Sequence, residues 1–309
     1  MAPTSATVSD GDVTEIAKAP APRAGFRRAI RSSLRRHGDA PDAGLPSTRL
    51  MLRGVDVAID RLADYDRVCG FRLSNALPVT YPHVLTFPIA LQLMTATDFP
   101  FPVAGLVHVG NRITQARPIR LGERLDITVH AESLRAHPRG QQFDLVATAT
   151  IDDREVWHGV STYLRRMEHA QTPTTNDGDR STGRSDADAD ADVVNAGPPT
   201  AIWHVDADTG RAYAAVSGDR NPIHVSRIGA RAFGFRRPIA HGMWTMARAV
   251  AALEGRLAET YTVDVAFRRP VPLPSIVEWR ARRDDGGWTI GVVEPGTGRR
   301  LLTGSIAPA

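Results

Sequence analysis

The chain has 309 residues, of which 42% are hydrophobic and 23% charged, a balance typical of folded globular domains. Its formal net charge is only +4, with arginine and acidic residues mixed along the chain, so composition does not favour a nucleic-acid partner. No apolar run reaches the roughly 20 residues that span a membrane, and the N-terminus lacks the apolar core of a signal peptide. Cys69 is the only cysteine, which excludes an intrachain disulfide and favours a reducing cytoplasm.

Residues 1–45 predict a disordered basic tail, because they are rich in Ala, Pro, Ser and Asp and have little apolar periodicity. Within it, Phe26, Ile30 and Leu34 recur every four residues in a basic stretch. A helix there could dock on an anionic surface, or the segment could be solvated. The apolar stripe is so narrow that we favour the solvated tail.

Residues 168–199 predict a flexible linker, because they are small and polar and cannot bury enough surface to order themselves. The linker separates two segments, 46–167 and 200–309, whose landmarks match. The glycine-to-proline spacings are 18 and 20 residues, and the next proline-to-proline spacings are 30 and 32. This pattern indicates one fold used twice. The matched landmarks are Gly70, Pro88-Ile89-Ala90 and Arg117-Pro118 in the first segment, and Gly218, Pro238-Ile239-Ala240 and Arg269-Pro270 in the second.

Each segment predicts a helical stretch, a turn-rich stretch, one apolar helix and then several strands. In the second segment the apolar helix is expected over Met243–Leu253, with Gly255 as its C-cap. This order indicates an α+β fold in which an antiparallel sheet wraps a central helix. The expected strands are Val107–Thr114, Arg124–Leu134, Gln142–Ile151, Glu155–Leu164, Tyr261–Arg268, Ile276–Arg282, Trp288–Val293 and Arg300–Ile306.

The segment SGDRNPIH, Ser217 to His224, contains an acid and a base five positions apart. Asn221 and Pro222 predict a helix start, with Asn221 as N-cap. His224 then lies in the first turn, where the helix dipole disfavours an imidazolium and keeps the ring neutral. Asp219 lies just outside the helix, so the two side chains could hold and deprotonate one water molecule.

The segment PIAHGM places Gly242 at the start of the apolar helix, where backbone amides lack intrahelical partners. An amide there could stabilise a thioester oxygen that gains charge during reaction. For either segment alone we favour a structural interpretation, as a turn or as a loop entering a buried helix. Both segments in this order, with Tyr213 and Ser217 ahead of them, favour a functional site.

These residues resemble the MaoC-like (R)-specific enoyl-thioester hydratases, in particular actinobacterial 3-hydroxyacyl-thioester dehydratases. The matching stretch runs from Tyr213 through Ser217, Gly218, Asp219, Asn221, Pro222 and His224 to Gly234-Phe235 and Pro238–Met243.

The resemblance implies a double hotdog fold, no metal or organic cofactor, and a hydro-lyase of fatty-acid metabolism. The reaction would be the reversible syn addition of water to a trans-2-enoyl thioester, giving a (3R)-hydroxyacyl thioester. Asp219 and His224 would handle the water, Asn221 would orient the site, and the Gly242 amide would bind the thioester carbonyl. Tyr213, Ser217 and Met243 would contact the substrate.

The first segment lacks this chemistry, because the landmark alignment places Phe71 at the position of Asp219 and Gln92 at that of Gly242. We therefore expect one active site per chain, with the first segment shaping an acyl-binding tunnel. The substrate carrier could be coenzyme A or an acyl-carrier protein, and both a monomer and a homodimer fit the sequence.

Two other functions are compatible with a hotdog fold. A thioesterase would need a carboxylate along the central helix, and Met243–Leu253 contains none. A non-catalytic acyl-thioester-binding protein would not need the set formed by Asp219, Asn221, His224 and Gly242.

Overall fold

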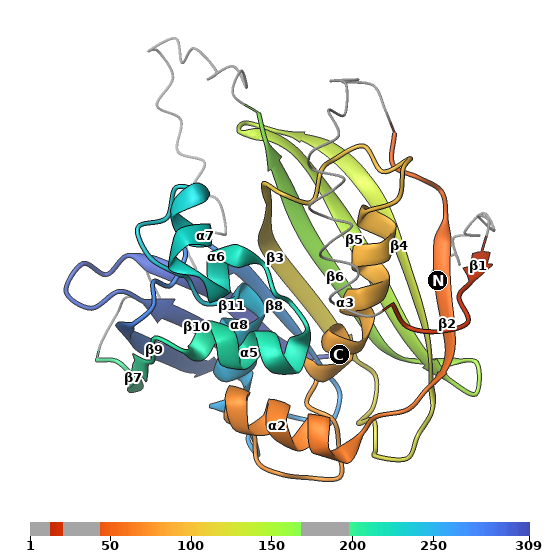
Figure 1. Cartoon of the computed structure of the whole chain (residues 1–309). Helices are drawn as coiled ribbons and strands as arrows, with labels where there is room; N and C mark the ends of the chain where they lie inside the picture. Colours follow the sequence, from red (N-terminus) through yellow and green to blue (C-terminus); the bar gives the residue numbers. More distant parts are fainter. Residues whose placement is uncertain (1–12, 21–43, 168–197) are drawn as a thin grey trace, which may run out of the picture.

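The computed structural model describes residues 13–20, 44–167 and 198–309, and these form two similar halves that lie side by side (Figure 1). The first half contains β2 (Arg49–Val55), α2 (Ile59–Cys69), α3 (Tyr81–Met94), β3 (Leu106–Gln115), β4 (Leu125–His137), β5 (Gly140–Ile151) and β6 (Arg154–Arg166). The second contains β7 (Ala201–Val205), α5 (Thr209–Ser217), α6 (Pro222–Val225), α7 (Arg227–Ala232), α8 (Gly242–Ala251), β8 (Tyr261–Phe267), β9 (Ser275–Asp284), β10 (Gly287–Val293) and β11 (Arg300–Pro308).

The strands of both halves join in one sheet with the same internal order. The first half runs β2-β4-β5-β6-β3 and the second runs β7-β9-β10-β11-β8. Antiparallel pairing of β3 with β8, for example Asn111 opposite Val265, joins them at the centre. The repeated order, with a helix packed on each antiparallel sheet, is the α+β double hotdog that the sequence predicts.

Each central helix is buried because it packs against the concave face of its own sheet. Most of α8 is buried, including Met246, Ala247 and Ala249 at 0% exposure. The helix ends at Ala251, before the predicted Leu253. The N–H groups of Leu253 and Glu254 donate to carbonyls only three residues back, so the chain has tightened into turns before Gly255. Gly255 is therefore not the C-cap.

The eight predicted strands are present, but the start of each half differs from the prediction. A strand, β2 or β7, precedes the first helix in each half. Part of the predicted disordered tail is also ordered, because β1 (Val13–Glu15) pairs in parallel with β2 at the edge of the sheet. The basic stretch 26–36 and nearly all of the predicted linker lie outside the described residues.

The landmark alignment of the two halves is wrong around the central helices. Pro88 lies inside α3, whereas Pro238 precedes α8.

Backbone hydrogen bonds before the central helices show which residues correspond. In the first half the Leu77 N–H donates to the Ile119 carbonyl, and in the second half the Ala240 N–H donates to the Val271 carbonyl. In that register Val79, and not Gln92, corresponds to Gly242.

The first helices of the two halves end alike. Gly70 after α2 and Gly218 after α5 both adopt the left-handed conformation, with φ of 83° and 79°. This correspondence keeps Phe71 at the position of Asp219. None of the helices in the described ranges is long and apolar enough to cross a membrane.

Candidate active site

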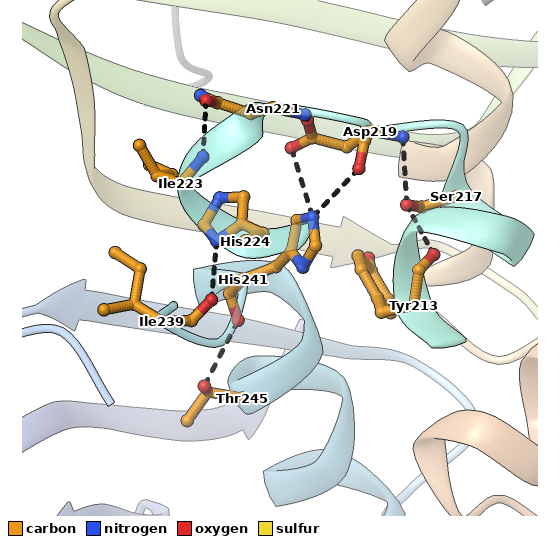
Figure 2. Close-up of polar contacts among 9 residues, drawn as sticks. All are labelled: Tyr213, Ser217, Asp219, Asn221, Ile223, His224, Ile239, His241 and Thr245. Carbon is orange, nitrogen blue, oxygen red and sulfur yellow. Dashed lines mark hydrogen bonds and ion pairs between the residues drawn. The ribbon is translucent and has the colours of Figure 1, made fainter. Parts of the chain in front are cut away.

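The turn after α5 fixes the Asp219 carboxylate. The Ser217 hydroxyl donates to the Tyr213 carbonyl at 2.8 Å and accepts the Asp219 N–H at 3.2 Å (Figure 2). The Asn221 N–H donates to Asp219 Oδ1 at 3.1 Å. Because Oδ1 is held by this turn, Oδ2 remains to face the neighbouring imidazoles.

The short helix α6 fixes His224. The Asn221 side chain accepts the Ile223 N–H at 3.3 Å and caps the helix, and Pro222 is its first residue, as predicted. His224 Nδ1 lies 2.8 Å from the Ile239 carbonyl oxygen, which can only accept, so Nδ1 carries the proton. His224 Nε2 is then an unprotonated base.

His241 is a further member of the site, to which the sequence analysis gave no role. It is the N-cap residue of α8 and is only 3% exposed. Its Nε2–H donates to the Asp219 backbone carbonyl at 3.0 Å and lies 3.8 Å from Asp219 Oδ2. Its ring stacks on that of His224 with 3.7 Å between centroids (Figure 2). The sequence feature that could have indicated a role for His241 is its position directly before Gly242.

Burial controls the ionisation of these three groups. It raises the pKa of Asp219, against the opposing effect of His224. It lowers the pKa of His224, against the opposing effect of Asp219, and lowers the pKa of His241 further because His224 adds to it. The pKa values of the acid and the base therefore approach each other, which makes proton exchange between them easier than in water. The main cause of the lowered pKa of His224 is burial, and not the helix dipole that the sequence suggests.

Gly242 begins α8, and its N–H makes no hydrogen bond within the described part of the chain. A side chain there would be crowded, because a Cβ on Gly242 would lie 3.1 Å from atoms of the Phe267 ring. The glycine therefore leaves room for a substrate oxygen to reach the amide.

A cleft of about 860 Å³ lies between the two halves, and every predicted site residue lines it. Tyr213 and Met243 are nearly buried, at 2% and 5% exposure, and present only small faces to it. The Ser217 hydroxyl is engaged by two backbone groups and so supports the turn. The predicted set is Tyr213, Ser217, Asp219, Asn221, His224, Gly242 and Met243.

The donor atoms of Asp219, His224 and His241 lie within 4.8 Å of one another, which is close enough to suggest a metal site. The two imidazoles are stacked only 28° from parallel, so their lone pairs do not converge on one point. The ring nitrogens His224 Nδ1 and His241 Nε2 are also engaged with carbonyls. The arrangement suits proton transfer better than coordination of a cation.

The fold defines a double hotdog protein with a cleft between its halves, which Asp219, His224 and His241 line. A model of the MaoC like domain matches residues 193–291. The chain is 35% identical over 262 residues to the 3-hydroxyacyl-thioester dehydratase X of Mycobacterium tuberculosis, covering 85% of this chain and 90% of that protein. It is 40% identical over 70 residues to the 3-hydroxybutyryl-CoA dehydratase of Methylorubrum extorquens, covering 21% of this chain and 45% of that protein.

Solved structures agree with this assignment. The crystal structure of HtdX from Mycobacterium tuberculosis superposes with a TM-score of 0.72 at 33% identity, covering 84% of this chain and all of that one. A MaoC-like dehydratase from Phytophthora capsici shares the fold, with a TM-score of 0.63 at 17% identity over 84% of this chain and 95% of that one. The chain belongs to the MaoC-like family of hotdog hydratases and dehydratases.

Proposed function

We propose that the chain catalyses the reversible hydration of trans-2-enoyl thioesters to (3R)-hydroxyacyl thioesters. The observation that carries this proposal is the placement of Asp219, His224 and the Gly242 amide around one cleft. These are the groups that addition of water to a conjugated thioester requires: a base, an acid and a donor for the carbonyl oxygen.

In the hydration direction, His224 Nε2 takes a proton from a water molecule whose oxygen bonds C3 of the substrate. The electrons of the C2–C3 double bond move toward the thioester carbonyl, and its oxygen accepts a hydrogen bond from Gly242 N–H. The Asp219 carboxylate accepts a hydrogen bond from the same water molecule and orients it. The His224 imidazolium then delivers its proton to C2, which restores the neutral imidazole. Because both groups sit on one wall of the cleft, the addition is syn.

His241 has a supporting role in this reaction. It does not need to exchange protons, because its Nε2–H is held by the Asp219 carbonyl at 3.0 Å. Its contact with His224 places one neutral ring against the other, and a second charge there would be strongly disfavoured. We therefore assign His241 as a positioning residue.

The carrier end of the substrate is proposed to lie along arginines at the open side of the cleft. Arg139, Arg166, Arg268 and Arg269 line it and are exposed. None of the four forms an ion pair with another residue in the described ranges. Arg268 Nε donates to Thr303 Oγ1 at 3.0 Å. Guanidinium groups without a carboxylate partner suit the phosphates of a pantetheine-based carrier, which coenzyme A and acyl-carrier protein share.

The test is hydration of crotonyl-CoA, followed as loss of enoyl absorbance, with chiral analysis of the product. Asp219→Asn and His224→Ala should each lower kcat by at least ~10², because positioned proton transfer contributes about that much. Asp206→Asn, on the exposed segment after β7, is the matched control. Full activity in both folded site variants would contradict the assignment. Release of free thiol would indicate a thioesterase, and binding without turnover would indicate an acyl-thioester-binding protein.

A further inference from the structure

Three polar aromatic side chains of the first half line the same cleft as Asp219 and His224. They are His83 from α3, His108 from β3 and Tyr163 from β6. Their rings form a stack, with centroids 6.1 Å apart for His83 and His108 and 4.8 Å apart for His108 and Tyr163, and with interplanar angles of 13° and 14°. The stack fixes the positions of the three rings.

Among the described residues, only one of these polar groups has a partner, because the His108 ring is held by a backbone hydrogen bond with Gly110. No hydrogen bond joins the Tyr163 hydroxyl or the His83 ring to another residue in the described part of the chain, and His108 Nε2 is buried without a partner. A wall built only to hold an alkyl chain would gain from apolar side chains at these positions. Polar groups retained there indicate a ligand that carries a polar atom.

Apart from Arg139, Arg165 and Arg166, the rest of the first-half wall is apolar. Its lining along α3, the segment before β3 and the first residue of β3 includes Phe87, Leu91, Met94, Val103 and Leu106. The polar stack therefore occupies one part of an otherwise apolar channel. The three rings could therefore recognise a polar substituent at one defined position along a bound acyl chain.

That point is close to the reacting carbons. The charge of Asp219 contributes to raising the pKa of Tyr163, so the phenol lies within electrostatic range of the acid. The His108 ring lies 5.0 Å from that of Phe267, which in turn packs against Gly242. A substituent that meets the stack is thus only a few bonds from the thioester.

We propose that His83, His108 and Tyr163 form a subsite for an acyl chain that carries a hydroxyl group a few carbons beyond the C2–C3 double bond. A neutral imidazole can accept a hydrogen bond and a phenol can donate one, so together they match a hydroxyl group. A ketone or ether oxygen only accepts, and a methylene does neither. This inference rests on the proposed hydratase function and names its substrate class.

The ionisation of the imidazoles agrees with this chemistry. Burial lowers the pKa of His83 to about 4 and, with help from His83, that of His108 to about 3. Both rings are therefore neutral near pH 7 and keep an accepting nitrogen.

The test compares trans-2-octenoyl-CoA with the same thioester carrying a hydroxyl group at C4, C5, C6 or C7 in turn. For wild-type protein, kcat/KM should be about tenfold higher for at least one hydroxylated thioester than for the parent, as one well-placed hydrogen bond predicts. Tyr163→Phe keeps the ring stack and should remove that preference while leaving kcat/KM for trans-2-octenoyl-CoA unchanged or higher. His83→Phe should act in the same direction.

Tyr261→Phe is the matched control, because Tyr261 is a buried tyrosine of β8 outside the cleft lining, and its variant should keep the preference. A wild-type protein that prefers no hydroxylated thioester, or a Tyr163→Phe variant that slows all thioesters equally, would overturn the inference. If the wild-type protein hydrates none of the thioesters, the proposed function fails and the inference fails with it.

Discussion

Two imidazoles in contact determine how the site responds to pH. A base must be neutral to accept a proton, so activity is lost as pH falls through the pKa of His224. Burial holds that pKa below 6.5. The acid limb of kcat/KM should therefore have its midpoint below pH 6.5, and a midpoint at or above 6.5 would contradict the assignment of His224 as base.

The variant His241→Phe tests whether His241 positions Asp219 or itself exchanges protons during the reaction. The variant keeps a ring against His224 but loses the Nε2–H that holds the Asp219 carbonyl. We expect kcat to fall about tenfold, the worth of one hydrogen bond, with KM little changed and the acid limb still below pH 6.5. An unchanged kcat would show that Asp219 needs no support from His241.

Asp66 is a second residue whose environment sets a measurable property. It is 1% exposed, its Oδ1 has no partner within the described ranges, and burial with the nearby Glu254 carboxylate raises its pKa to about 6. The folded protein therefore binds more protons than the unfolded chain between pH 3.8 and about 6. This residue's contribution to stability falls as pH rises through that window, and the loss persists above it.

Asp66→Asn removes the ionisation and should raise the free energy of unfolding by about 1–2 kcal/mol at pH 8. The gain should vanish near pH 4, where the native carboxyl is already protonated. Urea denaturation at both pH values measures it. Asp64→Asn, an exposed position on the same helix paired only with exposed Arg67, should change stability little at either pH.

At the scale of elements, the contact between the start of α8 and the end of β8 shapes the oxyanion position. Gly242→Ala keeps the N–H but places a methyl group 3.1 Å from the Phe267 ring, so one of them must shift. We expect kcat/KM for crotonyl-CoA to fall at least ~10-fold, since a small displacement of such a donor is costly.

Phe267→Leu tests this cause, because a smaller, flexible side chain makes room for the methyl group. The double variant Gly242→Ala/Phe267→Leu should recover part of the lost kcat/KM. In a double-mutant cycle, its loss should therefore be smaller than the sum of the losses of the two single variants. Additive losses would mean that the methyl group acts on the substrate and not on Phe267.

Most, but not all, of the secondary-structure elements can be predicted from the pattern of residues along the chain. Eight strands follow from alternating or β-branched runs, and α6 follows from Asn221 and Pro222. The strands β2 and β7 were missed although Leu50 and Leu52, and Trp203 and Val205, alternate with more exposed neighbours. Both runs are short, and each depends on pairing with a strand more than 60 residues away, namely β4 or β9.

At the scale of the whole molecule, buried neutral histidines couple stability to pH in the opposite sense from Asp66. In the unfolded chain His83 and His108 bind protons below pH 6.5. In the folded protein they do so only below about pH 4 for His83 and about pH 3 for His108. Stability therefore falls as the solution is acidified, by about 1.4 kcal/mol per pH unit for each histidine.

Between pH 6.5 and 5 these two residues should remove roughly 4 kcal/mol, partly offset by Asp66. The buried His224 and His241, whose pKa values are also lowered, add to the measured slope. His108→Phe should therefore reduce the loss of stability between pH 6.5 and 5 by roughly 2 kcal/mol, as measured by urea denaturation across the range. His204→Gln, at an exposed position of β7, is the control. A His108→Phe slope equal to that of wild-type protein would contradict the burial of a neutral ring.

The amino-acid sequence was sufficient for the repeated fold and for the local geometry of the candidate site. The turn at Asp219 and the helix start at Asn221, which holds His224, depend on neighbouring residues alone. The same sequence could not give the stack of His241 on His224, the true counterpart of Gly242, or the polar wall of His83, His108 and Tyr163. The polar wall joins residues up to 80 positions apart through the packing of α3 on its sheet and the pairing of β3 with β6, where His108 lies opposite Tyr163. Such contacts arise when distant strands find their register, and no local pattern encodes them.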